Sequence, residues 1–128
     1  MRFKQSLSVF NDLTAEISED VRKVGFKVLQ GVTLKTPKDK GLATSSWLVG
    51  IQSPPTEQPT VSPTDAAGST SYALNAGGQI IAVYPKNQLP DLWIVNNLPY
   101  IGKLNDGSSL QAPAKFVEQS IAEAVSGR

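Results

Sequence analysis

The sequence predicts an α+β fold in which a long N-terminal helix and a C-terminal helix pack on a small, mostly antiparallel sheet. Three observations support this prediction: apolar residues recur with helical period through the first third of the chain, two short stretches have strand character, and a second helical pattern closes the sequence. The 128 residues are the size of one domain, so we expect residues 1–128 to share a single core. A chain of this length buries roughly 65% of its unfolded surface, which is enough for a core without disulfides.

The composition excludes several kinds of active site. The chain has no His and no Cys, so it cannot build a thiol nucleophile, a Ser-His-Asp relay or most transition-metal sites. Its 12 basic and 11 acidic side chains give a formal charge of +1, which argues against binding nucleic acid through bulk positive charge. No apolar run approaches the ~18 residues of a membrane span. We therefore expect a protein made in the cytoplasm, without enzyme chemistry, cofactor, metal or membrane partner.

The first third of the chain predicts a helix over residues 4–32. Nine apolar positions, here called the apolar stripe, recur in eight steps over 29 residues, close to the 3.6 residues of a straight helical turn. They are Phe3, Leu7, Phe10, Leu13, Ile17, Val21, Val24, Val28 and Val32. Such a helix is roughly 43 Å long, so it would cross the whole domain or protrude from it. Phe26 lies off the stripe, and we expect it either under a strand or loop or against another subunit.

A strand and a Pro-rich loop are expected next. Within residues 46–52, Trp47, Val49 and Ile51 occupy alternate positions, the period of a strand with one well-buried face. The Pro-rich loop, residues 53–64, carries four prolines among polar residues and should form no packed element. If extended like polyproline it would reach roughly 37 Å, and loops of this length are often functional or mobile.

The remaining elements follow from turn residues and spacing. A cap at Thr64 and Asp65 predicts a helix ending at Pro85, although Gly77-Gly78 also permits a turn followed by a strand. Residues 92–95 are apolar on both faces, which indicates a central strand buried on both sides.

The chain should end in two helical segments. A helical turn is expected over 99–104, and a closing helix over 113–125 has Pro113 in its first turn. Trp47 and Trp93 both lie in predicted strands, so we expect both in the core.

The segment 36–41 is the first candidate for chemistry. Three lysines converge around it: Lys35, Lys38 and Lys40. They could contact a phosphate, although the segment lacks the spacing of a P-loop. The alternative is a structural turn that Pro37 enters and Gly41 permits, with the Asp39 carboxylate bonding neighbouring backbone N–H groups.

Two segments resemble a known family. Residues 36–47 are Thr-Pro-Lys-Asp-Lys-Gly-Leu-Ala-Thr-Ser-Ser-Trp, and residues 94–113 run from Ile-Val-Asn-Asn-Leu-Pro-Tyr through Leu-Asn-Asp-Gly-Ser-Ser to Leu-Gln-Ala-Pro. Together they resemble the tail-completion (neck, or head–tail joining) family of tailed bacteriophages. That family has approximately Thr-Pro-Val-Asp-Thr-Gly-Arg and Ser-Trp, then Asn-Asn-Leu-Pro-Tyr-Ala, then Leu-Glu-x-Gly-x-Ser-x-Gln-Ala-Pro before a closing helix. Leu42 and Asn105 stand where the family has Arg and Glu, so these two positions cannot form an ion pair.

The resemblance implies a structural protein of the virion. Copies would form a ring, commonly of six, that joins the capsid connector to the tail-terminator and tube proteins and lets DNA pass without sequence-specific contact. Lys35, Lys38 and Lys40 are the residues that could face this DNA. The positions that match the family motifs are candidates for architecture or interfaces: Thr36, Pro37, Asp39, Gly41, Trp47, Asn96, Asn97, Pro99, Tyr100, Leu104, Gly107, Gln111 and Pro113.

Two other functions stay open at this point. One is a tail terminator, which stops growth of the tail tube. The other, from a different class, is a small nucleic-acid-binding module that uses the three lysines and the basic residues of the first helix. A ring requires extended contacts between copies and not a catalytic pocket. Within the motif we expect Asn96 and Asn97 to cap the helical turn that begins at Pro99.

Overall fold

The computed structural model describes the chain except for residues 1–2, 37–41, 58–65, 100, 108–114 and 127–128, and of residues 3–12, 42 and 66–69 it describes the backbone alone. The elements in the described part are α1 (Phe3–Lys35), α2 (Leu42–Ser45), β1 (Trp47–Ile51), α3 (Ala66–Ala82), β2 (Leu92–Asn96), α4 (Ile101–Asn105) and α5 (Phe116–Ser126). The fold is α+β, as the sequence predicts.

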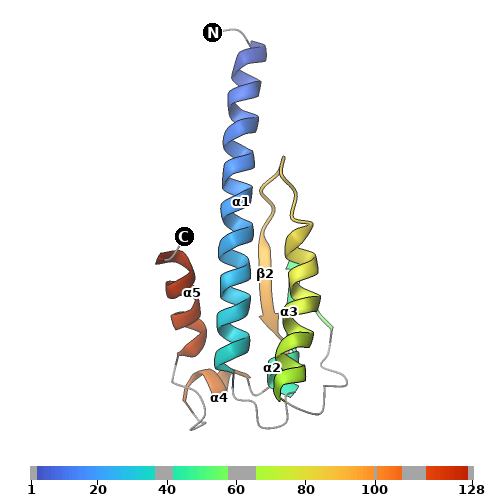
Figure 1. Cartoon of the computed structure of the whole chain (residues 1–128), viewed down its shortest axis with the longest axis vertical. Coiled ribbons are helices and arrows are strands. Elements are labelled where there is room, and N and C mark those ends of the chain that lie inside the picture. Colours follow the sequence, from blue (N-terminus) through green and yellow to red (C-terminus); the bar gives the residue numbers. More distant parts are fainter. Residues whose placement is uncertain (1–2, 37–41, 58–65, 100, 108–114, 127–128) are drawn as a thin grey trace.

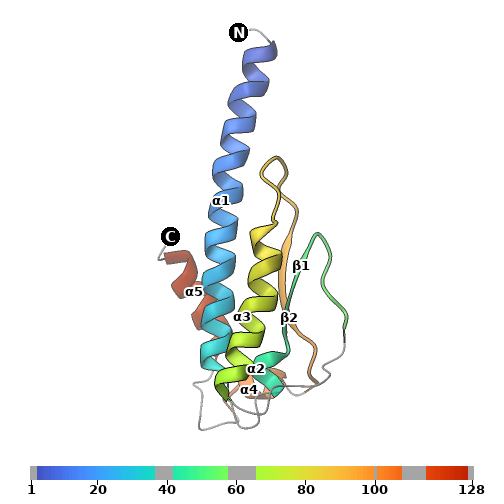
Figure 2. The ribbon, with the colours of Figure 1, turned by 45° about the vertical axis from the view of Figure 1, so that its right-hand side comes forward.

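Helix α1 is the longest element and runs along the length of the molecule (Figure 1). Its 33 residues correspond to about 50 Å, and its first turns extend well beyond every other labelled element (Figure 2). The helix predicted over 4–32 is present and continues to Lys35. It stops short of Pro37 because the residue before a proline is disfavoured in the helical conformation.

The core lies where the C-terminal half of α1 meets α3, β1 and α5. Its buried members are Leu29, Val32, Trp47, Val49, Ala73, Ile81 and Phe116. Two glycines permit the close approach of these elements. A Cβ at Gly31 would lie 2.8 Å from the Cβ of Ser120 on α5, and a Cβ at Gly77 on α3 would lie 2.6 Å from a methyl group of Leu29. Gly31, which weakens the helix by propensity, is therefore the point where α5 crosses α1.

The sheet has two antiparallel strands, with Trp47 opposite Asn96 and Ile51 opposite Leu92. Trp47 is buried as predicted, at 5% exposure. The prediction of a central strand buried on both faces is wrong for β2, because in the described part it pairs with β1 alone. The prediction that Trp93 lies in the core is also wrong: Trp93 is 38% exposed, and its indole N–H donates to the carbonyl oxygen of Gln52 at the surface (3.3 Å).

The buried face of α1 also differs from the apolar stripe in its upper half. Leu13 and Ile17 are 53% and 48% exposed, whereas Thr14 and Ser18 are buried. A buried hydroxyl is tolerated here because it can bond to a helix carbonyl: Ser18 Oγ donates to the oxygen of Ala15 (2.9 Å). In this part of α1 the apolar stripe therefore lies at the edge of the face that packs against the rest of the protein, and Thr14 and Ser18 lie at the centre of that face.

Other segments refine the sequence-based expectations. Helix α3 continues through Gly77 and Gly78, so the alternative of a turn and strand is not adopted. Phe26 lies against α3, where a Cβ on Gly78 would be 3.2 Å from its ring. The short helix α2 was not predicted. The closing helix begins at Phe116 in the described part, and Pro113 lies outside the described residues.

Candidate functional site: the motif junction and an apolar groove

Described parts of the two segments that carry the family resemblance lie side by side. Strand pairing places Trp47 directly opposite Asn96, and the Asn96 side-chain amide donates to the carbonyl oxygen of Ala43 (2.8 Å). We call this cluster, together with Thr36, the motif junction. It joins residues about 50 positions apart in the chain through backbone pairing and a side-chain hydrogen bond.

Thr36 ties the motif junction to the end of α1. The Trp47 indole N–H donates to Thr36 Oγ1 (2.8 Å), and the Thr36 hydroxyl donates to the carbonyl oxygen of Val32. Both side chains are buried, so this polar pair is enclosed and satisfied. By contrast, the buried hydroxyl of Thr44 has no hydrogen-bond partner within the described part of the chain.

Asn96 and Asn97 have different roles. The Asn96 side-chain oxygen accepts a hydrogen bond from the backbone N–H of Leu98 (3.1 Å), which forms a turn ahead of α4. The sequence predicts that Asn97 also caps this turn, and this prediction is wrong. The Asn97 amide instead donates to the carbonyl oxygens of Pro55 (3.2 Å) and Glu57 (2.9 Å), because the loop after β1 folds back against it.

Asn105 connects α4 to α5. Its side-chain oxygen accepts from the backbone N–H of Val117 (2.9 Å), and its amide donates to Glu118 Oε1 (2.8 Å). The hydrogen bond from Asn105 is the main cause that lowers the pKa of Glu118 below its ordinary value. Asn105 therefore acts as a helix cap for α5. Nearby, Leu104 packs against the core and Gly107 takes a φ of 96° after α4.

The lysines of the first candidate segment are placed only in part. Lys35 lies at the end of α1, where its ammonium contacts Glu123 Oε1 (2.8 Å) and Ser120 Oγ (3.5 Å) on α5. Pro99 is exposed in front of α4. The other predicted positions lie outside the described residues: Pro37, Lys38, Asp39, Lys40, Gly41, Tyr100, Gln111 and Pro113.

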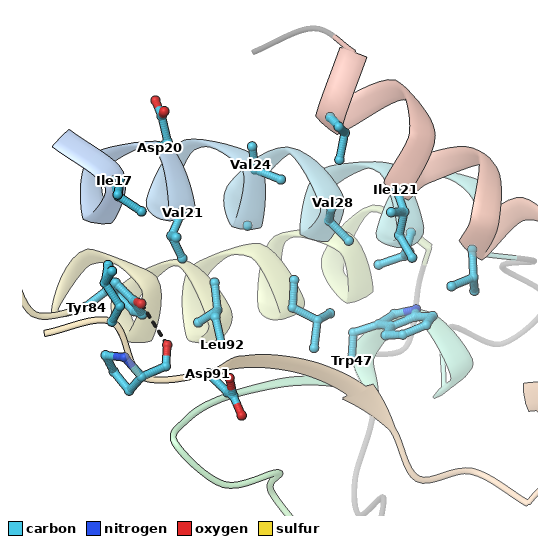
Figure 3. Close-up of a pocket in the computed structure, with 17 residues that line it drawn as sticks. Ile17, Asp20, Val21, Val24, Val28, Trp47, Tyr84, Asp91, Leu92 and Ile121 are labelled. Atoms are coloured by element: carbon cyan, nitrogen blue, oxygen red, sulfur yellow. Dashed lines mark hydrogen bonds between the residues drawn. The ribbon is translucent and has the colours of Figure 1, made fainter. Parts of the chain in front are cut away.

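A second feature, an apolar groove, was not predicted from the sequence. It runs along α1 between α5 and the sheet, with a volume of about 690 Å³. Figure 3 shows Val21 and Val28 of α1, Ile121 of α5 and Leu92 of β2 pointing into the same space. Its lining is Ile17, Asp20, Val21, Val24, Gly25, Val28, Val32, Trp47, Tyr84, Leu89, Pro90, Asp91, Leu92, Ile94, Val117, Ile121 and Val125.

The groove is open to solvent at its rim. Ile17, Leu89, Ile121 and Val125 are each about half exposed. Five positions of the apolar stripe, from Ile17 to Val32, line it. The signal that could have revealed the groove is therefore the stripe itself, which is longer than the packing partners of α1.

Tyr84 holds the upper end of the groove together. Its hydroxyl donates to the carbonyl oxygen of Pro90 (2.7 Å), and its own carbonyl accepts from the Arg22 guanidinium of α1 (2.9 Å). Burial raises the pKa of the Tyr84 phenol above its ordinary value, and the Asp91 carboxylate adds to this shift. These bonds fasten the connection between α3 and β2 to α1.

Within the described part, no three His, Cys, Asp or Glu side chains come together as metal ligands would. None of the described helices is both long and apolar enough to span a membrane. Comparisons with protein-family models, with curated proteins and with solved structures find no match for this chain.

Proposed function

We propose that this chain is a structural subunit of a tailed bacteriophage. Copies of the chain form a ring at the head–tail junction, which joins the connector to the tail tube and lets DNA pass. In this role it acts in tail completion, and its partners are further copies of itself and the adjoining neck and tail proteins. The DNA in the lumen is contacted without sequence specificity.

The observation that carries this proposal is the motif junction. The two segments that resemble the family are separate in the sequence, yet they share one hydrogen-bonded cluster in which Trp47 pairs with Asn96 and Asn96 bonds to Ala43. A motif whose separate parts meet in the fold is more specific than either part alone. Such a junction supplies rigid architecture and not a reacting group.

The apolar groove and the projecting part of α1 also support an assembly role. Contiguous apolar surface on a small protein commonly marks a protein–protein contact. Closed rings are generated by contacts between different surfaces of neighbouring copies.

The proposal is tested by interrupting the coding sequence in the genome that encodes the chain and inspecting particles by electron microscopy. We expect DNA-filled heads and separate tails to accumulate, and the wild-type chain supplied in trans to restore joining. Joined, infectious particles in normal number without the chain would overturn the proposal. Tails of uncontrolled length would overturn it in favour of a tail terminator.

A nucleic-acid-binding module is separated from this role by titration with duplex DNA at several salt concentrations. We expect weak binding, because Lys35 is engaged by Glu123 (2.8 Å) and the chain carries little net charge. Micromolar affinity at physiological salt, with a slope of several ions, would show instead that DNA binding is the main activity. Comparing the Lys35→Gln variant with the parent in the same titration measures how much this lysine contributes to DNA affinity.

A further inference from the structure

We propose that the apolar groove is filled by α1 of a second copy of this chain. The two α1 helices pack antiparallel about a two-fold axis near Ile17, so that residues 3–17 of each copy cover the groove of the other. This dimer is a state of the free chain before assembly, and the inference does not rest on the proposed function.

The first argument is that the groove and the projecting helix share one stripe. Its lower half, Ile17 to Val32, forms the floor of the groove and rises about 22 Å. Its upper half, Phe3 to Ile17, continues the same helical period and rises about 21 Å. The two halves match in length about Ile17, which is the self-complementarity that a two-fold contact requires.

The second argument is that α1 projects beyond every other labelled element of the structure (Figures 1 and 2). The last buried positions toward the N-terminus in the described side chains are Thr14 and Ser18. Above them the helix extends past the tip of the connection between α3 and β2 (Figures 1 and 2). Most of the stability of a helix in a protein comes from packing of its apolar face, so a partner that covers the apolar stripe stabilises these first turns.

The third argument is the amount of surface. The chain has an accessible surface of 8056 Å², whereas a compact monomer of 13.7 kDa exposes about 6,600 Å². The surplus of about 1,460 Å² exceeds the ~800 Å² that each partner buries in a standard interface and lies in the range of obligate dimers.

The arrangement has a consequence for assembly. A two-fold contact closes on itself and leaves no free surface of the same kind, so it cannot propagate into a filament. Free copies would thus keep the apolar stripe covered until another partner replaces the second copy.

The absence of cysteine from the chain makes a direct test possible, because an introduced thiol is unique. Ile17→Cys places that thiol near the proposed axis, where it meets its own counterpart, and we expect nearly complete disulfide-linked dimer under mild oxidation. Leu34→Cys is the matched control: it is on the same helix and 63% exposed, but outside the groove. Failure of Ile17→Cys to cross-link, or equal cross-linking of both variants, would overturn the antiparallel dimer.

A second measurement uses the unmodified chain and light scattering at tens of micromolar. We expect a mass of about 27 kDa, twice the 13.7 kDa of one copy. Ile121→Glu on the groove wall should weaken association by about tenfold or more, because it places a charge in the contact, and Leu34→Glu should leave it unchanged. A monomer at these concentrations, or a larger ring, would overturn the inference.

The outcomes separate this inference from the proposed function. A monomeric chain that still enters virions contradicts the dimer alone. A dimer that never enters virions contradicts the proposed function alone.

Discussion

Trp47 and Thr36 are joined by a buried hydrogen bond of 2.8 Å between the indole N–H and the threonine hydroxyl. The bond links the start of β1 to the residue that follows α1, and Trp47 also pairs with Asn96 across the sheet. One side chain thereby connects the long helix, the strand pair and both family-like segments. The stability of the motif junction should accordingly depend on the Thr36 hydroxyl and not only on apolar burial.

Replacing Thr36 by Val tests this dependence. The substitution leaves a buried indole N–H without its acceptor, so we expect a loss of about 1–3 kcal/mol in the free energy of unfolding. Thr44→Val is the matched control, because that buried hydroxyl has no partner within the described residues. It should be neutral or slightly stabilising in the same urea titration. Equal losses in the two variants would contradict the role of the bond.

The crossing of α5 over α1 should be sensitive to a single methyl group. In Gly31→Ala the new Cβ would lie 2.8 Å from the Cβ of Ser120, so one helix must shift, at a cost of about 1–3 kcal/mol. Gly102→Ala on α4 meets nothing within 4 Å and should be stabilising by up to about 1 kcal/mol. Thermal unfolding of both variants checks the pair, and a Gly31→Ala variant as stable as the parent would refute the close contact.

The cap of α5 predicts a change in one pKa. Asn105→Ala removes both the bond to the Val117 N–H and the amide that lowers the pKa of Glu118. We expect the free energy of unfolding to fall by about 0.5–2 kcal/mol. An NMR titration should show the Glu118 pKa rising toward its ordinary value of 4.5.

Asn105→Asp separates these two effects. Asp retains the helix cap, but its carboxylate should raise the pKa of Glu118. A lowered pKa stabilises the fold above the unfolded pKa, and that contribution disappears as the pH falls through the folded value. Acid unfolding should therefore depend less on Glu118 in both variants. A Glu118 pKa that stays as low in Asn105→Asp as in the parent would contradict this assignment.

Alkaline unfolding should depend on Tyr84. Its pKa is raised above 10.0 by burial and by Asp91, so its contribution to stability is complete below pH 10 and decreases as the pH rises further. At pH 7 the Tyr84→Phe variant should have a free energy of unfolding about 0.5–1.5 kcal/mol lower than the parent, because it lacks the hydrogen bond to Pro90. Between pH 7 and high pH, its free energy of unfolding should fall less than that of the parent. The exposed Tyr72→Phe should match the parent at pH 7. Denaturant unfolding at pH 7 and above pH 10 measures both effects, and parallel curves for Tyr84→Phe and the parent would disprove the role of its ionisation.

Much of the fold follows from local patterns. Helical period located α1, and alternation located β1, because these signals report one element at a time. The prediction of α3 also needed a cap at Thr64 and Asp65 and a stop at Pro85, and it left a turn and a strand open as the alternative. The period could not show which face of α1 is buried. Thr14 and Ser18 are buried, which is tolerated for Ser18 because its hydroxyl bonds within its own helix, and the apolar stripe lies beside the groove.

The candidate site was predictable only where it depends on sequence motif. Trp47 was expected in the core and is there, whereas the apolar run around Trp93 suggested a central strand although β2 has one partner among the described strands. Strand position depends on how many neighbours assemble, which no single strand encodes. The groove arises from the separation of α5 and β2 across α1. The apolar stripe indicates apolar surface on α1, but it does not encode the distance between these two other elements.

The most direct test of the assembly role is to locate the chain in mature particles made by the genome that encodes it. Electron microscopy of purified virions that carry an affinity label on the chain, with quantitative mass spectrometry of the same particles, gives both its position and its copy number. We predict label confined to the head–tail junction, with the few copies of a single ring. A chain absent from infectious particles, or spread over the capsid or along the tube, would contradict the account.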